Sequence, residues 1–207
     1  MSIHPYYQDQ ALAYFQQTVQ INPASFLRPL TVYLAKGASI LDIGCGSGRD
    51  MLWLGQRGYR CWGLEGASDL ARLAEKHAEQ PVIEADFESF DFSSWSVDAL
   101  VLVGALVHVP HEGVHRILQR ILTALKSGGL VLITLKQGRG KSRGEDGRVF
   151  YLWEQKEIEE IFQKLGLHIL HYAQQVSKVR RSDVWMGWVM RDTQGAGRMS
   201  EKVAGTM

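Results

Sequence analysis

The chain has 207 residues, enough for one core of ordinary size. Hydrophobic residues make up 45% and charged residues 22%, which excludes the disordered, collagen-like and coiled-coil classes. The formal charge of +1 gives no overall field that would attract nucleic acid or an anionic membrane. The longest uncharged apolar stretch, 99–107, is about half of the roughly 18 residues that span a bilayer, and no signal-peptide pattern is seen. We therefore expect a cytoplasmic protein that binds neither a membrane nor nucleic acid.

Few residues suit a metal site. Cys45 and Cys61 are the only cysteines and form no CxxC pair, so neither a disulfide scaffold nor structural zinc is indicated. His108, His111 and His115 lie close together, and the last two share one helical face. Because this segment coincides with an ordinary strand-to-helix turn, we expect no metal.

The first part of the chain is expected to be helical. The segments 8–20 and 25–36 are predicted as helices, the second bent or restarted at Pro29. Together they would form an N-terminal helical cap over residues 1–37. Strands are predicted from the short apolar runs that follow, namely 39–43, 60–65, 82–86, 97–103 and 130–136.

Helical periodicity separates these runs. The clearest helix is 112–126, whose apolar residues recur at the spacing of one buried stripe and whose carboxyl end Lys126 would complement. Ser68 is expected to cap a helix over 69–79, and another amphipathic helix is expected to end at Gly166.

Two late apolar runs, 167–176 and 184–190, have no helix-length segment between them and should pair antiparallel. The alternation of strands and helices predicts an α/β fold with helices on both faces of a mixed seven-stranded sheet whose last strand is antiparallel. This domain would span 38–191, and residues 192–207 would be a disordered tail.

The glycine-rich segment after the first strand is the strongest sign of a ligand site. Gly44, Gly46 and Gly48 lie between a strand and a helix, where backbone N–H groups can approach an anionic ligand closely. The dinucleotide fingerprint needs Gly or Ala where Arg49 stands, and the phosphate loop of nucleotide hydrolases needs a Lys that is absent here. A nicotinamide cofactor and ATP are therefore disfavoured.

Asp42 and these three glycines resemble the first motif of the class I S-adenosylmethionine-dependent methyltransferases. The resemblance continues along most of the chain, through the segments 63–65, 85–87, 98–110 and 128–134. It implies a Rossmann-like class I methyltransferase fold that binds S-adenosylmethionine and releases S-adenosylhomocysteine.

The resemblance also implies roles for individual residues. Asp42 would tie the glycine loop or the ammonium group of the ligand through water. Glu65 would accept both ribose hydroxyls, and Asp86 and Phe87 would bind the adenine. The cofactor-binding residues are then Asp42, Gly44, Cys45, Gly46, Gly48, Glu65, Gly66, Asp86, Phe87 and Gly104.

His108 is the candidate general base, four residues beyond Gly104 on the loop after the fourth strand. The alternative is a neutral histidine bonded to nearby backbone. A soft nucleophile such as a thiolate would need no base.

Two basic loops, 136–148 and 177–183, leave strand ends on the cofactor side of the sheet. We expect the first to be mobile and both to close over an anionic acceptor, with leading tyrosines completing the lid; the alternative is a solvated surface loop. The substrate-binding candidates are Tyr6, Tyr14, Arg139, Arg143, Arg180 and Arg181.

The sequence thus predicts an S-adenosylmethionine-dependent methyltransferase that acts, as a monomer or homodimer, on a small and anionic acceptor. A non-catalytic S-adenosylmethionine-binding module is the alternative outside enzymes. An RNA or protein methyltransferase is disfavoured, because the appendages leave little surface for a macromolecule.

Overall fold

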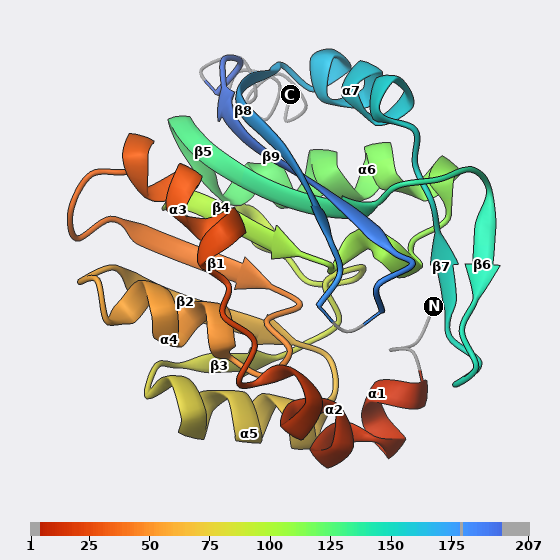
Figure 1. The fold of residues 1–207 in the computed structure, drawn as a ribbon. Coiled ribbons are helices and arrows are strands. Elements are labelled where there is room, and N and C mark those ends of the chain that lie inside the picture. The colour runs from red at the N-terminus through yellow and green to blue at the C-terminus, as the bar shows by residue number, and fades with distance from the viewer. Residues whose placement is uncertain (1–4, 179, 196–207) are drawn as a thin grey trace, which may run out of the picture.

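The computed structural model describes residues 5–178 and 180–195. Its centre is a seven-stranded sheet in the order β3-β2-β1-β4-β5-β9-β8 (Figure 1). The strands are β1 (Ser39–Ile43), β2 (Arg60–Glu65), β3 (Val82–Glu84), β4 (Val97–Val103), β5 (Leu125–Lys136), β8 (Leu167–Val176) and β9 (Val184–Asp192). Strand β9 runs antiparallel to both β5 and β8, which confirms the predicted mixed sheet.

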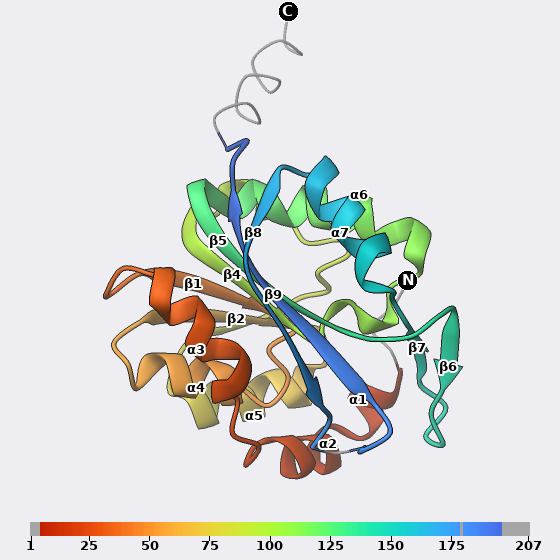
Figure 2. The same cartoon turned by 45° about the horizontal axis from the view of Figure 1, so that its top comes forward.

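Helices cover both faces of the sheet. They are α1 (Pro5–Asp9), α2 (Ala11–Thr18), α3 (Ala24–Tyr33), α4 (Arg49–Gly55), α5 (Ser68–Ala78), α6 (His111–Ile121) and α7 (Gln155–Lys164). Figure 2 shows α3, α4 and α5 on one side of the sheet, with α6 and α7 on the other.

Alternate residues of the strands serve the two faces. Leu41 and Ile43 of β1 belong to the apolar cluster under α6 and α7, whereas Ile40 belongs to the cluster under α3 and α4. All three side chains are fully buried, so β1 carries apolar residues on both faces of the sheet. This burial on both faces explains why the segments predicted as strands are mostly apolar and do not alternate with polar residues.

The N-terminal helices differ from the prediction. The expected helix over 8–20 is divided at Gln10 into α1 and α2, whereas α3 continues through Pro29. The α1–α2 segment packs on α5 through a small separate cluster that includes Ala11 and Leu70. These two short helices therefore lie outside the main core.

The predicted helix over 112–126 is too long. Helix α6 ends at Ile121, a 3₁₀ turn follows at Leu122–Ala124, and β5 already begins at Leu125. Lys126 is consequently a strand residue, and its Nζ lies 2.6 Å from Asp98. Pairing of Leu125 with β4 outweighs the apolar periodicity that favoured more helix.

Ser68 does not cap α5 as expected. It is the first residue of the helix, the cap position belongs to Ala67, and no side chain caps this end. The Ser68 hydroxyl instead accepts a hydrogen bond from Gln8, which helps to join α1 to α5.

The loop expected over 136–148 contains a regular hairpin. Strands β6 (Lys141–Arg143) and β7 (Val149–Tyr151) pair antiparallel, and the hairpin projects from the end of β5 (Figure 1). At the other end, β9 continues to Asp192, and residues 196–207 of the predicted tail lie outside the described residues. No helix among residues 5–178 and 180–195 is long and apolar enough to cross a membrane.

Candidate cofactor and acceptor site

A cavity of about 570 Å³ lies at the carboxyl ends of the parallel strands. Residues that follow β1, β2 and β4 line it, together with residues of the N-terminal helices and the β6–β7 hairpin. Open α/β sheets bind ligands at this edge, and the volume is in the range of small-molecule sites. The cavity is therefore the candidate site.

The glycine loop forms one wall of the cavity. The backbone N–H groups of Gly44 and Cys45 donate to the carbonyl of Leu64 on β2, which holds the loop against the sheet. Gly48 has a φ of +71°, and a Cβ there would lie 2.7 Å from the carbonyl oxygen of Ala74 on α5. Only glycine fits this close approach between loop and helix.

Glu65 stands at the end of β2 and is 8% exposed. Its carboxylate accepts backbone N–H groups from Gly46 and Ala67, each at 3.0 Å. Burial raises the pKa of Glu65, and these hydrogen bonds oppose the rise. A carboxylate has about four acceptor positions, so Glu65 can hold the loop and still accept hydroxyl donors from a ligand.

Asp42 lies behind the glycine loop and is buried. Its Oδ2 has no hydrogen-bond partner among the described residues. Burial raises the pKa of Asp42 well above its ordinary value, and the neighbouring Asp50 raises it further. A second cavity of about 30 Å³ is lined by Asp42 and Ser47, with room for one water molecule. The space and the unsatisfied oxygen suit a polar group bound through water.

The remaining wall includes Gly104, just after β4. Its N–H donates to Thr134 Oγ1 at 2.9 Å, and its φ is +72°. A Cβ at Gly104 would lie 3.3 Å from the indole of Trp185, so a larger residue here would crowd this ring. Asp86 and Phe87 also line the cavity.

The predicted cofactor residues thus come together. Those that line the large cavity are Gly44, Gly46, Glu65, Gly66, Asp86, Phe87 and Gly104. Asp42 and Cys45 line the small cavity behind the loop, and Gly48 packs on α5. The buried carboxylate of Glu65, the unsatisfied oxygen of Asp42 and the close backbone of the loop fit S-adenosylmethionine.

His108 lies on a 3₁₀ turn, Leu106–His108, and lines the same cavity. Its Nδ1 is 2.5 Å from the carbonyl oxygen of Val149, and its Nε2 is 2.8 Å from the hydroxyl of Tyr7. Because a carbonyl oxygen only accepts, Nδ1 carries the proton and Nε2 accepts from Tyr7. Burial raises the pKa of Tyr7, which keeps this phenol protonated as a donor.

Arg148 was not among the predicted site residues. It directly precedes β7 and lines the cavity. Nε and Nη2 of Arg148 donate to Asp146 at 3.0 and 2.7 Å, and Nη1 donates to the Tyr7 hydroxyl at 3.2 Å. Its guanidinium also lies 4.1 Å from the centre of the Tyr6 ring. Arg148 therefore fastens α1 to the hairpin. Nothing in the local sequence distinguishes it from the other basic residues of this loop.

The candidate substrate residues divide into two groups. Tyr14 and Arg180 line the cavity. Tyr6 does not line it but packs against Tyr7 and Arg148, which do. Arg139, Arg143 and Arg181 are exposed and lie away from the cavity, which corrects their expected position.

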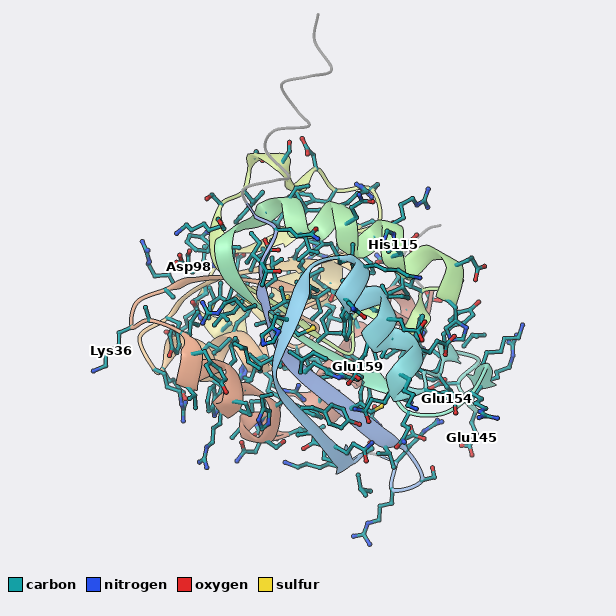
Figure 3. The ribbon with its side chains drawn as sticks, turned by 90° about the horizontal axis from the view of Figure 1, so that it is seen from above. Lys36, Asp98, His115, Glu145, Glu154 and Glu159 are labelled. Atoms are coloured by element: carbon teal, nitrogen blue, oxygen red, sulfur yellow. The ribbon has the colours of Figure 1, made fainter. Side chains whose placement is uncertain are left out.

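Arg139 and Arg143 make their contacts outside the cavity, which explains why they do not line it. Arg139 is 83% exposed and pairs with Glu154 at 2.8 Å, while Arg143 donates to the carbonyl of Gly147 within the hairpin. Figure 3 shows Glu145 and Glu154 on the same side of the molecule, where the hairpin and the start of α7 meet.

His111, like His108, lies within hydrogen-bond distance of a backbone carbonyl oxygen. His111 Nε2 lies 2.8 Å from the carbonyl oxygen of Leu152, and its ring packs on Trp153. In the part of the chain that the structure describes, no group of three or more His, Cys, Asp or Glu residues could hold a metal ion.

Known proteins share this architecture. Residues 41–133 match the family model of a methyltransferase domain. An uncharacterized protein, MJ1252 of Methanocaldococcus jannaschii, is 31% identical over 100 residues, which are 48% of this chain and 37% of that protein. The ubiquinone biosynthesis O-methyltransferase of Coxiella burnetii is 25% identical over 170 residues, 74% of this chain and 68% of that enzyme.

A solved structure extends the likeness to the whole fold. The 1,6-didemethyltoxoflavin N1-methyltransferase of Burkholderia thailandensis, solved with its acceptor and S-adenosylhomocysteine, has a TM-score of 0.72 at 20% identity. The match covers 91% of this chain and 84% of that one, and it shows a shared Rossmann-like fold. Residues 41–133 thus form a methyltransferase domain, and the chain has the fold of the class I S-adenosylmethionine-dependent methyltransferases.

Proposed function

We propose that this protein transfers the methyl group of S-adenosylmethionine to a small-molecule acceptor bound beside Gly104. The observation that carries the proposal is the Tyr7–His108 hydrogen bond at the cavity wall. It places a basic imidazole nitrogen and a phenol within the same cavity as the glycine loop. A module that only binds the cofactor has no need of such a pair.

The cavity beside Gly104 suits an aromatic or otherwise planar acceptor. Phe150 and Trp185 line this part, and the His108 ring lies 4.8 Å from the Phe150 ring. Aromatic walls bind planar apolar groups well. The Burkholderia methyltransferase of similar fold holds 1,6-didemethyltoxoflavin, and the Coxiella relative is named for ubiquinone biosynthesis.

When bound, S-adenosylmethionine supplies an electrophilic methyl group on a positively charged sulfur. The protein then mainly has to align the acceptor and exclude water, and alignment alone can contribute about 7–11 kcal/mol. In the proposal, Glu65 holds the ribose, Asp86 and Phe87 hold the adenine, and Gly104 leaves room for the reacting groups. The α1–α2 segment covers them.

An acceptor that loses a proton would give it to the Tyr7 oxygen, while Tyr7 passes its own proton to His108 Nε2. The acceptor gains a methyl group and loses one proton, and His108 ends as an imidazolium that retains its Nδ1–H bond to Val149. His108 is thus the base, and Tyr7 touches the acceptor. General bases contribute about 10²–10⁴-fold to such reactions.

Calorimetric titration with S-adenosylhomocysteine, followed by a turnover screen of phenols, amines and acids, tests the proposal. We expect S-adenosylhomocysteine to bind one molecule per chain, NADH not to bind, and at least one acceptor to be methylated. Binding of NADH with no binding of S-adenosylhomocysteine would contradict the proposed function. Cofactor binding without turnover of any acceptor would favour a non-catalytic role.

A further inference from the structure

Five cationic side chains line the cavity, and three of them form close ion pairs with carboxylates. Arg49 pairs with Asp50 at 2.6 Å. Lys136 is 7% exposed, and its Nζ lies 2.6 Å from Asp183. Arg148 donates two hydrogen bonds to Asp146. Lys136, Asp183 and Arg148 line the cavity, so both of these pairs hold a cation at its wall.

Arg180 is held less firmly. It lies on the connection between β8 and β9 and lines the cavity, and its side chain is 39% exposed. Its ion pair among the described residues is with Asp146, at 3.9 Å, which is too long for a hydrogen bond. Asp146 already accepts two hydrogen bonds from Arg148, so two guanidinium groups share one carboxylate.

The charge around Arg180 is therefore positive. Arg148 and Arg180 together with Asp146 carry a formal surplus of one positive charge at the cavity wall. The remaining cation, Lys178, donates to the backbone carbonyl of Asn22 and has no acidic partner among the described residues. Five cationic and five acidic side chains line the cavity as a whole, so this surplus is confined to the part of the wall around Arg180.

We propose that Arg180 binds an oxyanion group of the methyl acceptor, an inference that rests on the proposed function. The acceptors are then carboxylic acids or phosphate monoesters. The planar guanidinium presents paired N–H donors that match carboxylate and phosphate oxygens. Phe150 and Trp185 would bind the apolar body of the same molecule. The acid group then sits at the cavity rim, and the body of the acceptor extends toward His108 and Gly104.

Arg181 provides a matched control. It carries the same charge one position further along, but it is exposed and does not line the cavity. Arg180→Gln and Arg181→Gln change the net charge equally. Only the first removes a guanidinium from the cavity wall.

The test is calorimetry on the protein saturated with S-adenosylhomocysteine, with benzoate, phenyl phosphate and the neutral benzamide as probes. Benzoate and phenyl phosphate distinguish a carboxylate site from a phosphate site. We expect at least one of them to bind about tenfold or more tightly than benzamide. Arg180→Gln should weaken that binding about tenfold or more, and Arg181→Gln should leave it unchanged.

Three results would overturn the inference: no preference for the anionic probes, no binding of any probe, or equal weakening in the two variants. The preceding titration with S-adenosylhomocysteine alone tests the proposed function separately. Its failure would contradict cofactor binding, whereas intact cofactor binding without a preference for anions would contradict only the role of Arg180.

Discussion

The hydroxyl of Tyr7 lies 2.8 Å from Nε2 of His108, although 101 positions separate them in the chain. This contact joins α1 to the turn after β4 across the mouth of the cavity. It brings a proton donor and a basic nitrogen to the place where the methyl acceptor is proposed to bind.

Replacing Tyr7 by Phe removes the hydroxyl and keeps the ring. For an acceptor that loses a proton we expect kcat to fall about 10²-fold or more, because the proton has no path to His108. The affinity for S-adenosylhomocysteine, measured by calorimetry, should change little. Tyr33→Phe is the control, since the Tyr33 hydroxyl is exposed and donates to Leu170 away from the cavity. Equal kcat values for wild type and Tyr7→Phe would exclude the proton path.

Glu65 makes cofactor binding depend on pH. Its pKa is raised by burial, and in the proposed complex the ionised form accepts the two ribose hydroxyls. As the pH falls through this raised pKa, the carboxyl gains a proton and the affinity for S-adenosylhomocysteine should fall. We expect the Glu65→Gln variant to bind weakly at every pH between 7.5 and 5. A wild-type affinity that does not fall as the pH is lowered from 7.5 to the ordinary carboxyl pKa of 4.5 would contradict this role.

Substitutions of Gly48 and Gly58 distinguish the effect of backbone strain from the effect of loop packing. Both have positive φ, +71° and +85°, so alanine at either site costs about 1–2 kcal/mol in strain. A Cβ at Gly58 meets no described atom within 4 Å outside its chain neighbours, whereas one at Gly48 meets the backbone of Ala74.

Gly48→Ala should therefore lower Tm further than Gly58→Ala, by about 2–4 °C for each extra kcal/mol. Only Gly48→Ala should also weaken binding of S-adenosylhomocysteine, because it moves the glycine loop. Equal losses of Tm in a thermal unfolding experiment would show that α5 adjusts to the added methyl group.

Asp98 stabilises the fold at a distance from the site. Burial alone would raise the pKa of Asp98, but hydrogen bonds from Lys126 and Ser39 outweigh burial and lower it to about 2. In Figure 3, Asp98 lies on the opposite side of the molecule from Glu145 of the hairpin. Its substitution should therefore leave cofactor affinity unchanged.

A carboxyl whose pKa is lower in the folded state stabilises the protein above its unfolded pKa and loses this effect as the pH falls toward the folded value. Asp98→Asn should lower the free energy of unfolding at pH 7 by about 1 kcal/mol. The difference from wild type should shrink as the pH falls from 3.8 toward 2. Denaturant unfolding at pH 7, 4 and 3 measures it, and a difference that stays constant would contradict the assignment.

The strands could be predicted because local composition determines them. Strands β1, β2 and β4 have the predicted bounds, since each is an apolar run buried on both faces. The end of α6 could not be predicted, because the apolar pattern continues through Leu125 and only its pairing with β4 turns this residue into a strand.

Some features of the site, like the strands, could be predicted from the sequence, and others could not. The glycine loop and Glu65 form a short-range pattern that the sequence displays directly. The choice of Arg148 over Arg139 and Arg143 depends on the hairpin register and on the carboxylate of Asp146. The approach of Tyr7 to His108 depends on how α1 packs on α5. Neither arrangement has a local signal in the sequence.

A crystal structure of the protein with S-adenosylhomocysteine tests the central claim most directly. The account predicts that the ribose hydroxyls bind Glu65, the adenine lies against Phe87 and Asp86, and the sulfur lies beside Gly104 with Tyr7 and His108 beyond it. A ligand whose sulfur lies away from Gly104 and His108, or whose ribose does not reach Glu65, would contradict it.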